Sequence, residues 1–155
     1  LNFQVWGSAS GGQVDELRLE STDATYINLR AYGGNLDFEH TKVFGWDTTR
    51  NRAHNPSNEN TPRSYISAVS EIITNPGETC EGRAKNTMGE ARMDIVSSEM
   101  AYLGYQGAEA YGLTWKVRGF CTDKSNPELF DEVNVYGNIY DSDIHHNRFA
   151  VYTYG

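Results

Sequence analysis

Short runs in which apolar and polar residues alternate recur along the whole chain. Such alternation is typical of β-strands that bury one face. Sequences rich in Gly, Asn and Pro separate several of these runs, as expected where a chain turns tightly. The pattern predicts an all-β protein with strands at residues 14–19, 26–32, 35–39, 42–45, 65–73, 92–97, 113–117, 133–136, 139–140 and 150–154.

One strand–turn–strand pattern occurs twice in the C-terminal third. The first copy combines residues 94–100 with 111–116, and the second combines 138–144 with 149–154. Short strands repeated with polar corners are the signature of a solenoid, in which each rung buries its apolar face against neighbouring rungs. The repeat therefore predicts a right-handed parallel β-helix. An antiparallel sandwich is the alternative fold for the same strand pattern.

Two spacings bear on the length of one rung. Ile95, Val117 and Ile139 are evenly spaced, at an interval that we interpret as one β-helix rung. Aligning the two copies of the repeat instead pairs Lys116 with Tyr154, which are further apart. We interpret this larger interval as one rung plus an insertion. The even spacing and the alignment of the repeat therefore predict different registers of one rung on the next.

Two polar stretches do not fit the rung pattern and are predicted to be surface insertions. Residues 47–63 are rich in Asn, and residues 121–129 contain Lys-Ser-Asn-Pro-Glu. Long loops on a regular scaffold often carry function. In the first insertion, Arg50, Arg52 and Arg63 are candidate partners for carboxylates, with an ordinary charged loop as the alternative.

Charge and length limit the classes of partner and the number of domains. The chain has 155 residues, which fits a single domain covering residues 1–155. Its 13 basic and 21 acidic residues give a net charge of −8. This balance argues against a nucleic-acid partner, although a local basic stripe is compatible with a polyanionic ligand. No apolar run reaches the roughly 18 residues of a membrane span.

The two cysteines, Cys80 and Cys121, lie in loop-like sequence. A disulfide between them is plausible outside the cell, and two unpaired thiols are the alternative. The chain begins at Leu1 without an initiating Met or a signal-peptide pattern. We therefore expect a processed chain or a part of a longer one, in which the same β-helix could continue past Gly155.

Other motifs give no cofactor or metal site. No Gly-x-Gly-x-x-Gly sequence or phosphate-binding loop occurs. His40 and His54 are isolated in the sequence and lack metal-ligand spacing. Calcium could be bound by Glu132, Asp141 and Asp143, but their spacing matches no calcium loop, and acidic turn residues are the preferred interpretation.

Four motifs in the second half of the chain belong together. They are Arg-Met-Asp-Ile at 92–95, Glu-Ala-Tyr-Gly-Leu-Thr-Trp-Lys-Val at 109–117, Tyr-Gly-Asn-Ile at 136–139 and Ile-His-His-Asn at 144–147. In combination they resemble the mannuronan C5-epimerases of brown algae and bacteria. This resemblance implies a secreted, extracellular, right-handed parallel β-helix whose partner is an acidic polysaccharide, alginate, in which mannuronate is converted to guluronate.

The implied chemistry sets clear requirements for the site. A base removes the C5 proton beside the uronate carboxylate, and an acid returns a proton on the opposite face. A cation must stabilise the enolate-like charge that develops in between. The family's Tyr-Gly-Phe-Asp-Pro-His-Asp motif, which carries the acid and base, is absent here, and we expect it about one rung beyond Gly155. The chain is therefore expected to be incomplete as an isomerase, and its catalytic residues stay unknown.

Two alternatives to the epimerase-like function remain open. One is a non-catalytic extracellular solenoid that binds carbohydrate or assembles end to end. The other is a polyuronate lyase, which shares the proton abstraction but eliminates the substituent at O4. The missing acid and base motif favours the first alternative.

The aligned copies supply candidate substrate-binding residues. Strand alternation directs Lys116, Tyr152 and Tyr154 outward, with Thr114 opposite Tyr152 and Lys116 opposite Tyr154. Lys116 is the candidate for neutralising a substrate carboxylate, and Arg118 is a possible second cation. Tyr152 and Tyr154 are candidates for stacking on sugar rings. A solvated lysine and simple packing between rungs are the competing interpretations.

His145 and His146 complete the set of candidates. They could contact substrate or serve as acid and base, but neighbours on a strand face opposite sides, so at most one is expected to face the groove. Histidines at a rung corner that bond to the backbone are the competing interpretation.

Overall fold

The computed structural model describes residues 2–6, 15–73, 87–107, 110–118 and 134–154. All regular elements in these segments are strands, and no helix among them is long and apolar enough to cross a membrane. The strands are β1 (Asn2–Trp6), β2 (Asp15–Ser21), β3 (Asn28–Tyr32), β4 (Gly34–Glu39), β5 (Thr41–Asp47), β6 (Arg52–Ala53), β7 (Tyr65–Ile73), β8 (Thr87–Gly89), β9 (Ala91–Val96), β10 (Glu99–Ala101), β11 (Gly112–Arg118), β12 (Val135–Tyr140), β13 (Asp143–His145) and β14 (Phe149–Tyr154).

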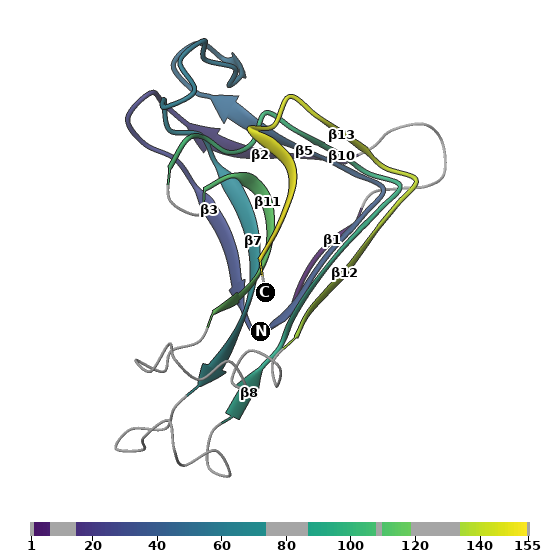
Figure 1. The fold of residues 1–155 in the computed structure, drawn as a ribbon. Helices are drawn as coiled ribbons and strands as arrows, with labels where there is room; N and C mark the ends of the chain where they lie inside the picture. The colour runs from purple at the N-terminus through teal and green to yellow at the C-terminus, as the bar shows by residue number, and fades with distance from the viewer. Residues whose placement is uncertain (1, 7–14, 74–86, 108–109, 119–133, 155) are drawn as a thin grey trace.

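Three parallel sheets form the sides of a triangular prism (Figure 1). Sheet A has the order β1-β4-β9-β12, sheet B has β2-β5-β10-β13, and sheet C has β3-β7-β11-β14. Chain order and spatial order agree in every sheet, so each circuit of the chain adds one strand to each side. This arrangement confirms the predicted parallel β-helix and excludes the antiparallel sandwich. Among the strands of the described segments, β6 and β8 pair antiparallel, with β5 and β7.

The two copies of the sequence repeat stack directly on each other. Ile95 pairs with Ile139 in sheet A, and Met100 pairs with Ile144 in sheet B. One circuit in this region, as from Asp94 to Asn138, therefore spans 44 residues. Val117 lies on sheet C, so interpreting the even spacing of Ile95, Val117 and Ile139 as one rung was wrong. Apolar positions recur on all three sides of the prism, and equal spacing along the chain does not identify one side.

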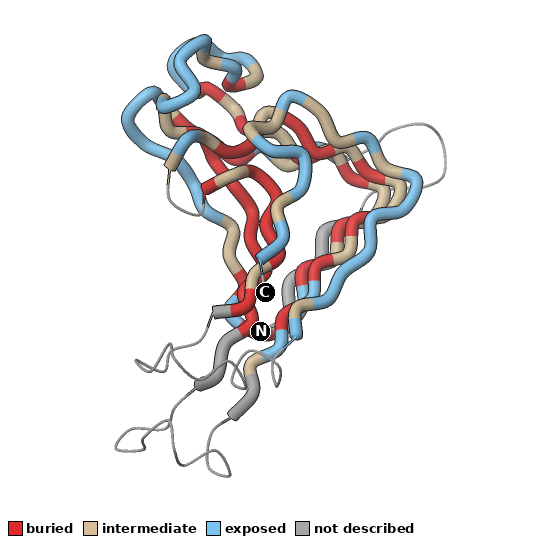
Figure 2. The backbone as a smooth tube through the Cα atoms, viewed as in Figure 1, coloured by how far each residue is buried: buried red, intermediate tan, exposed pale blue. Residues whose placement is uncertain are grey.

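The core is a set of apolar columns inside the prism. Phe38 and Ile95 are stacked in sheet A, and Ile66 and Leu113 are stacked in sheet C, all essentially inaccessible to solvent. In the last described rung the corresponding position of sheet A is less covered, since Ile139 is 41% exposed. Figure 2 shows this change from buried inner rungs to an exposed last rung. Each rung thus depends on its neighbour for burial of its apolar face.

Residues in the left-handed backbone region form the corner between sheets A and B. His40, Ser97 and Asp141 occupy the same place in successive rungs, with φ of 50°, 47° and 48°. Their backbones are joined, since the amide of His40 donates to the carbonyl of Val96 at 3.1 Å and that of Ser97 donates to Tyr140 at 2.9 Å. Asp141 is therefore a corner residue in this column.

Residues 47–63 leave the rung pattern between β5 and β7, as predicted for the first insertion. The second predicted insertion, residues 121–129, lies outside the described residues. The same holds for Glu132 and for both cysteines of the expected Cys80–Cys121 disulfide, which stays a prediction.

Candidate functional site

The outer surface of sheet C brings the predicted columns together. Thr114 pairs with Tyr152 and Lys116 pairs with Tyr154, which confirms the alignment of these two pairs. The register shifts between Gly112 and Thr114, so that Leu113 has no single partner on β14. Such a bulge changes the pairing locally without reversing the faces of the residues that follow.

Each column extends across all four strands of the sheet. Alternation directs these residues outward, because the residues between them, such as Ala31, Ala68 and Trp115, belong to the core. We use the name sheet C face for the two outward columns Arg30–Ser67–Thr114–Tyr152 and Tyr32–Val69–Lys116–Tyr154.

Lys116 is half-buried at the C-terminal side of the sheet C face. Its ammonium nitrogen lies 5.5 Å from the centre of the Tyr154 ring, a cation–π distance. The backbone of Arg118 continues β11 in register with Glu71, and its side chain lies outside the described part of the structure. The structure therefore places Lys116 and Tyr154 together, and the predicted role of Arg118 stays a prediction.

Two buried hydroxyl groups lie in the middle of the sheet C face. Ser67 and Thr114 are 2% and 1% exposed, and neither hydroxyl oxygen has a hydrogen-bond partner among the residues that are described. An unsatisfied buried hydroxyl costs about 1–3 kcal/mol. The two groups are adjacent in one column, flanked by the longer side chains of Arg30 and Tyr152. A ligand that displaced these flanking side chains would find two ready hydrogen-bonding groups.

Tyrosines and an arginine line the N-terminal side of the same face. The guanidinium of Arg30 donates to the hydroxyls of Tyr32, at 2.6 Å, and of Tyr65. Burial raises the pKa of Tyr65, and burial together with a hydrogen bond to Tyr26 raises that of Tyr105 to about 12. These phenols therefore stay protonated at neutral pH and can donate hydrogen bonds.

A second aromatic group borders the C-terminal side. The ring of Tyr111 lies 4.6 Å from that of Tyr152 and 5.2 Å from that of Phe149. Tyr152 thus packs against neighbours in its own and the preceding rung. This agrees with the competing interpretation, in which outward aromatic side chains simply pack between rungs. Tyr154 is more exposed than Tyr152.

The two histidines lie apart from Lys116, at the end of sheet B and the corner that follows. His145 ends β13, and its Nε2 lies 2.9 Å from Glu99 Oε1, while its Nδ1 lies 2.6 Å from Nδ1 of His146. The expectation that neighbouring histidines face opposite sides was wrong here. His146 follows the strand with a φ of 55°, which ends the alternation and lets the two rings meet.

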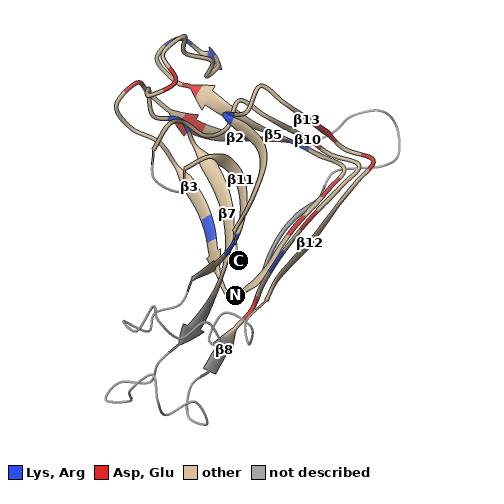
Figure 3. Ribbon diagram, viewed as in Figure 1, with Lys and Arg blue, Asp and Glu red and all other residues tan. Residues whose placement is uncertain are grey.

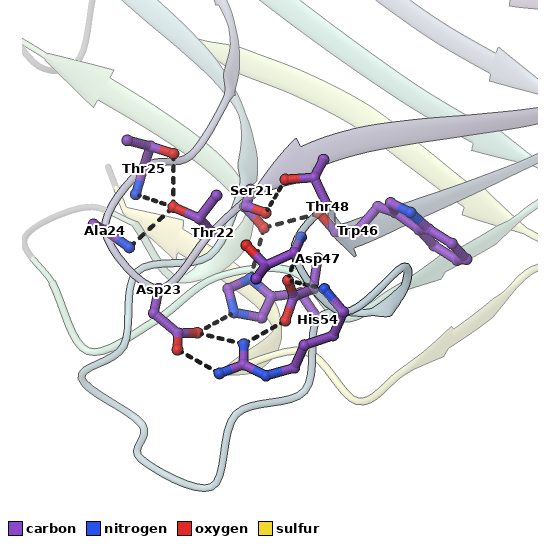
Figure 4. Close-up of polar contacts among 11 residues, drawn as sticks. Ser21, Thr22, Asp23, Ala24, Thr25, Trp46, Asp47, Thr48 and His54 are labelled. Atoms are coloured by element: carbon purple, nitrogen blue, oxygen red, sulfur yellow. Dashed lines mark hydrogen bonds and ion pairs between the residues drawn. The ribbon is translucent and has the colours of Figure 1, made fainter.

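A polar cluster at the first insertion was missed in the sequence (Figure 4). Arg50 binds both oxygens of Asp23, at 3.0 and 2.7 Å, and also contacts Asp47 at 2.5 Å. His54 bridges Ser21 Oγ, at 2.6 Å, and Asp23, at 3.3 Å. His54, which is isolated in the sequence, therefore gains these partners only through the fold. The cluster borders a cleft of ≈ 370 Å³ lined by Asp23, Asp47, Arg50, Arg52, His54, Asn55, Pro56, Ser57, Asn58 and Thr61.

The cluster acts as a latch between the insertion and the turn after β2. One ligand atom each from Asp23, Asp47 and His54 lies within 4.8 Å of the others, as in a metal site. The guanidinium of Arg50 already holds the cation position between the two carboxylates. A serine nucleophile must be accessible, and the acid that orients its histidine is buried. Here Ser21 is buried, and the Asp23 side chain is half exposed. The cluster therefore stabilises the loop and offers no accessible nucleophile.

Loss of the Asp23–Arg50 pair should be visible in the acid stability of the protein. The hydrogen bond from Arg50 lowers the Asp23 pKa from 3.8 to about 2. A depressed pKa contributes stability that is present above the unfolded value and is lost as the pH falls from about 4 toward 2. We expect the melting temperature of the Asp23→Asn variant to depend less on pH over this interval than that of the unchanged protein. The control is Asp141→Asn at an exposed corner, and equal pH profiles for the two variants would contradict the latch.

Comparison with known proteins supports the fold. The chain is similar in structure to the periplasmic alginate epimerase AlgG, with a TM-score of 0.62 and 19% identity over 90% of this chain and 27% of that chain. It is also similar to a mutant of AlgG, with a TM-score of 0.52 and 17% identity over 89% and 30% of the two chains. No family model and no curated protein matches the sequence. The chain thus shares the fold of an alginate epimerase while spanning less than a third of its length.

Proposed function

We propose that this chain is an alginate-binding β-helix of the mannuronan C5-epimerase type, and that the sheet C face holds the polymer. The observation that carries the proposal is the pairing of Lys116 with Tyr154 beside the buried, unpaired hydroxyls of Ser67 and Thr114. Together they offer a cation for a carboxylate, an aromatic surface for a sugar ring and hydrogen bonds for sugar hydroxyls.

The geometry of the solenoid suits a repeating ligand. Successive rungs add one strand about every 4.8 Å, so a polymer lying along the prism axis meets a similar side-chain position at each rung. The sheet C face has basic groups at two of its rungs, Arg30 and Lys116, although the whole chain has a net charge of −8. Figure 3 shows acidic positions, with a few basic ones among them, on sheets A and B, while sheet C carries basic positions in the part that is drawn in colour. A local basic stripe of this kind allows an acidic protein to bind a polyanion.

Epimerisation of the bound polymer is a further part of the proposal, beyond binding. Lys116 would stabilise the charge that develops on a uronate carboxylate when the C5 proton leaves. The acid and base of the family motif are absent from this chain, so binding is the part of the function that its own residues support. A location outside the cytoplasm belongs to the same proposal and is supported by the periplasmic neighbour.

End-to-end assembly is the second candidate, because the last described rung exposes apolar side chains. Ile139 is 41% exposed, and Val151 and Phe149 are 42% and 43% exposed. Side chains of this kind are normally covered by a further rung, of the same or another molecule.

Replacing Lys116 by Ala should weaken alginate binding about tenfold, which corresponds to about 1.4 kcal/mol. The loss should shrink at high salt, because the contact is electrostatic. Isothermal titration with alginate oligomers measures the affinity, and far-UV circular dichroism checks the fold. Lys42→Ala on sheet B is the matched control. The proposal fails if the two variants lose equal affinity, or if Lys116→Ala binds as well as the unchanged protein.

A further inference from the structure

We infer that Ser67 and Thr114 are specificity-determining residues, which hold the C2 and C3 hydroxyls of one uronate ring while Lys116 holds the carboxylate of the same ring. Tyr152 covers the two protein hydroxyls in the unbound chain and moves aside when the polymer binds. This inference rests on the proposed binding of alginate to the sheet C face, and it adds which groups of the sugar that face recognises.

Ser67 and Thr114 differ from other buried hydroxyl residues of the described structure. Ser70 donates to a backbone carbonyl at 2.8 Å and accepts from a backbone amide at 2.7 Å, and Ser98 donates to a backbone carbonyl at 2.7 Å. The hydroxyls of Ser67 and Thr114 are comparably buried but have no such partner among the described residues. A buried polar group without a partner needs an explanation, and a ligand that supplies the partner is one.

Both hydroxyls point toward the outer surface of sheet C. The residues before and after each of them belong to the hydrophobic core, so strand alternation directs Ser67 and Thr114 outward. The two residues are paired in register on β7 and β11, and neighbouring strands lie about 4.8 Å apart. They are therefore separated from a ligand by side chains of the same face rather than by backbone.

The position of Lys116 relative to these hydroxyls fits a single sugar ring. Lys116 follows Thr114 by two residues on β11, which places the two Cα atoms about 6.6 Å apart and both side chains on one face. In a uronate ring the carboxylate is on C5, and the C2 and C3 hydroxyls lie across the ring from it. A polymer linked through C1 and C4 presents these two sides laterally when it lies along the prism axis. A ring between the two outward columns therefore directs its carboxylate to Lys116 and its hydroxyls to Ser67 and Thr114.

Tyr152 forms the cover over the two hydroxyls. It is the partner of Thr114 in the last described rung, and its half-buried ring packs against Tyr111 at 4.6 Å and Phe149 at 6.4 Å between ring centres. A tyrosine side chain is longer than the spacing of about 4.8 Å between strands, so the ring can reach over Thr114 toward Ser67. Rotation of this one side chain to another staggered rotamer uncovers the site, and no strand has to move.

The other end of the same column is held by Arg30. This residue pairs with Ser67 in register, and its guanidinium donates to the hydroxyls of Tyr32 and Tyr65. Arg30 therefore stays in place when Tyr152 moves, and its positive charge lies one rung from Ser67, where it favours a polyanion.

Burial makes the two hydroxyls selective. A hydroxyl both donates and accepts, so each can pair with a hydroxyl of the sugar. A site with buried hydrogen-bonding groups strongly rejects a ligand that lacks the matching group, because the groups of the site then stay unpaired. Lys116 by itself would accept a carboxylate of any polymer. Ser67 and Thr114 therefore restrict the sheet C face to uronates whose C2 and C3 hydroxyls are unmodified.

Removing either hydroxyl should stabilise the unbound protein and weaken binding at the same time. Ser67→Ala and Thr114→Val each delete an unpaired buried hydroxyl, so we expect each to raise the melting temperature by about 3 °C. Isothermal titration with alginate oligomers should show about tenfold weaker binding for each variant. Ser98→Ala is the matched control, because its hydroxyl is bonded within the fold. It should lower the melting temperature and leave the affinity unchanged.

Two further measurements separate recognition of the sugar from a local packing effect. Alginate oligomers with methylated C2 and C3 hydroxyls should bind the unchanged protein at least tenfold more weakly than unmodified oligomers. In Tyr152→Ala, which opens the site to water, adding Thr114→Val should no longer raise the melting temperature. A rise that persists without the tyrosine ring would remove Tyr152 as the cover.

Three results would overturn the inference. They are a lower melting temperature in Thr114→Val, unchanged alginate affinity in Ser67→Ala and Thr114→Val, and equal affinity of the unchanged protein for methylated and unmodified oligomers. Weaker binding in Lys116→Ala with full binding in both hydroxyl variants would remove this inference and keep the proposed function. If the unchanged protein does not bind alginate, or if Lys116→Ala binds it equally well, the proposed function fails and the inference fails with it.

Discussion

Gly45→Ala is expected to lower the free energy of unfolding by about 3 kcal/mol, the upper range for overpacking a close contact. A Cβ at Gly45 on β5 would lie 2.2 Å from the carbonyl oxygen of Tyr102, in the next rung. That oxygen belongs to a corner residue with a φ of 61°, so the backbone there has little freedom to retreat. Urea unfolding followed by tryptophan fluorescence measures the loss.

Gly107→Ala is the matched control for this substitution. Its Cβ would lie 2.3 Å from the ring of Tyr105, and the far end of a half-buried side chain can shift more easily than backbone. We expect a cost of about 1 kcal/mol for this variant. Equal losses for Gly45→Ala and Gly107→Ala would show that the corner of the next rung is not held rigidly against β5.

The need for glycine at position 45 illustrates what the sequence could not predict. Alternation along each strand is a local property, and it correctly predicted most of the strands, although not β1, β6, β8, β10 and β13. The repeat predicted the parallel β-helix, and its alignment predicted the pairing of Lys116 with Tyr154. The contact between Gly45 and Tyr102 depends on how one rung lies on the next, which no local pattern records. The length of one circuit was misjudged for the same reason.

The candidate site was predictable only in part. Lys116, Tyr152 and Tyr154 could be placed on one face because strand alternation determines their direction. The unpaired hydroxyl of Ser67 could not be predicted, because its burial depends on longer side chains from neighbouring rungs. The contact of His145 with His146 was missed, because a single left-handed residue overrides strand alternation.

The latch shows a further limit of sequence reasoning. Asp23 and Arg50 lie in loops from different rungs, 27 residues apart. Neither residue belongs to a periodic pattern, so nothing in the sequence indicated that they meet. Only the path of the first insertion back across the turn after β2 brings them together.

Ile95→Ala is expected to cost about 3 kcal/mol, because it removes methyl groups from a fully buried position and leaves a cavity. Ile139 occupies the same column one rung later, where it is 41% exposed. The same substitution there should cost only about 1 kcal/mol, since less apolar surface is lost and no closed cavity forms. Urea unfolding of both variants at one protein concentration gives the comparison.

The ratio of these two losses tests whether the last rung is covered in solution. A loss at Ile139 as large as that at Ile95 would contradict the open rung and require a neighbour packed on β12. If that neighbour is a second copy of the chain, the melting temperature must rise with protein concentration, and Ile139→Ala must remove that dependence. A small loss at Ile139 and a melting temperature independent of concentration would instead argue against end-to-end assembly and leave the sheet C face as the basis of function.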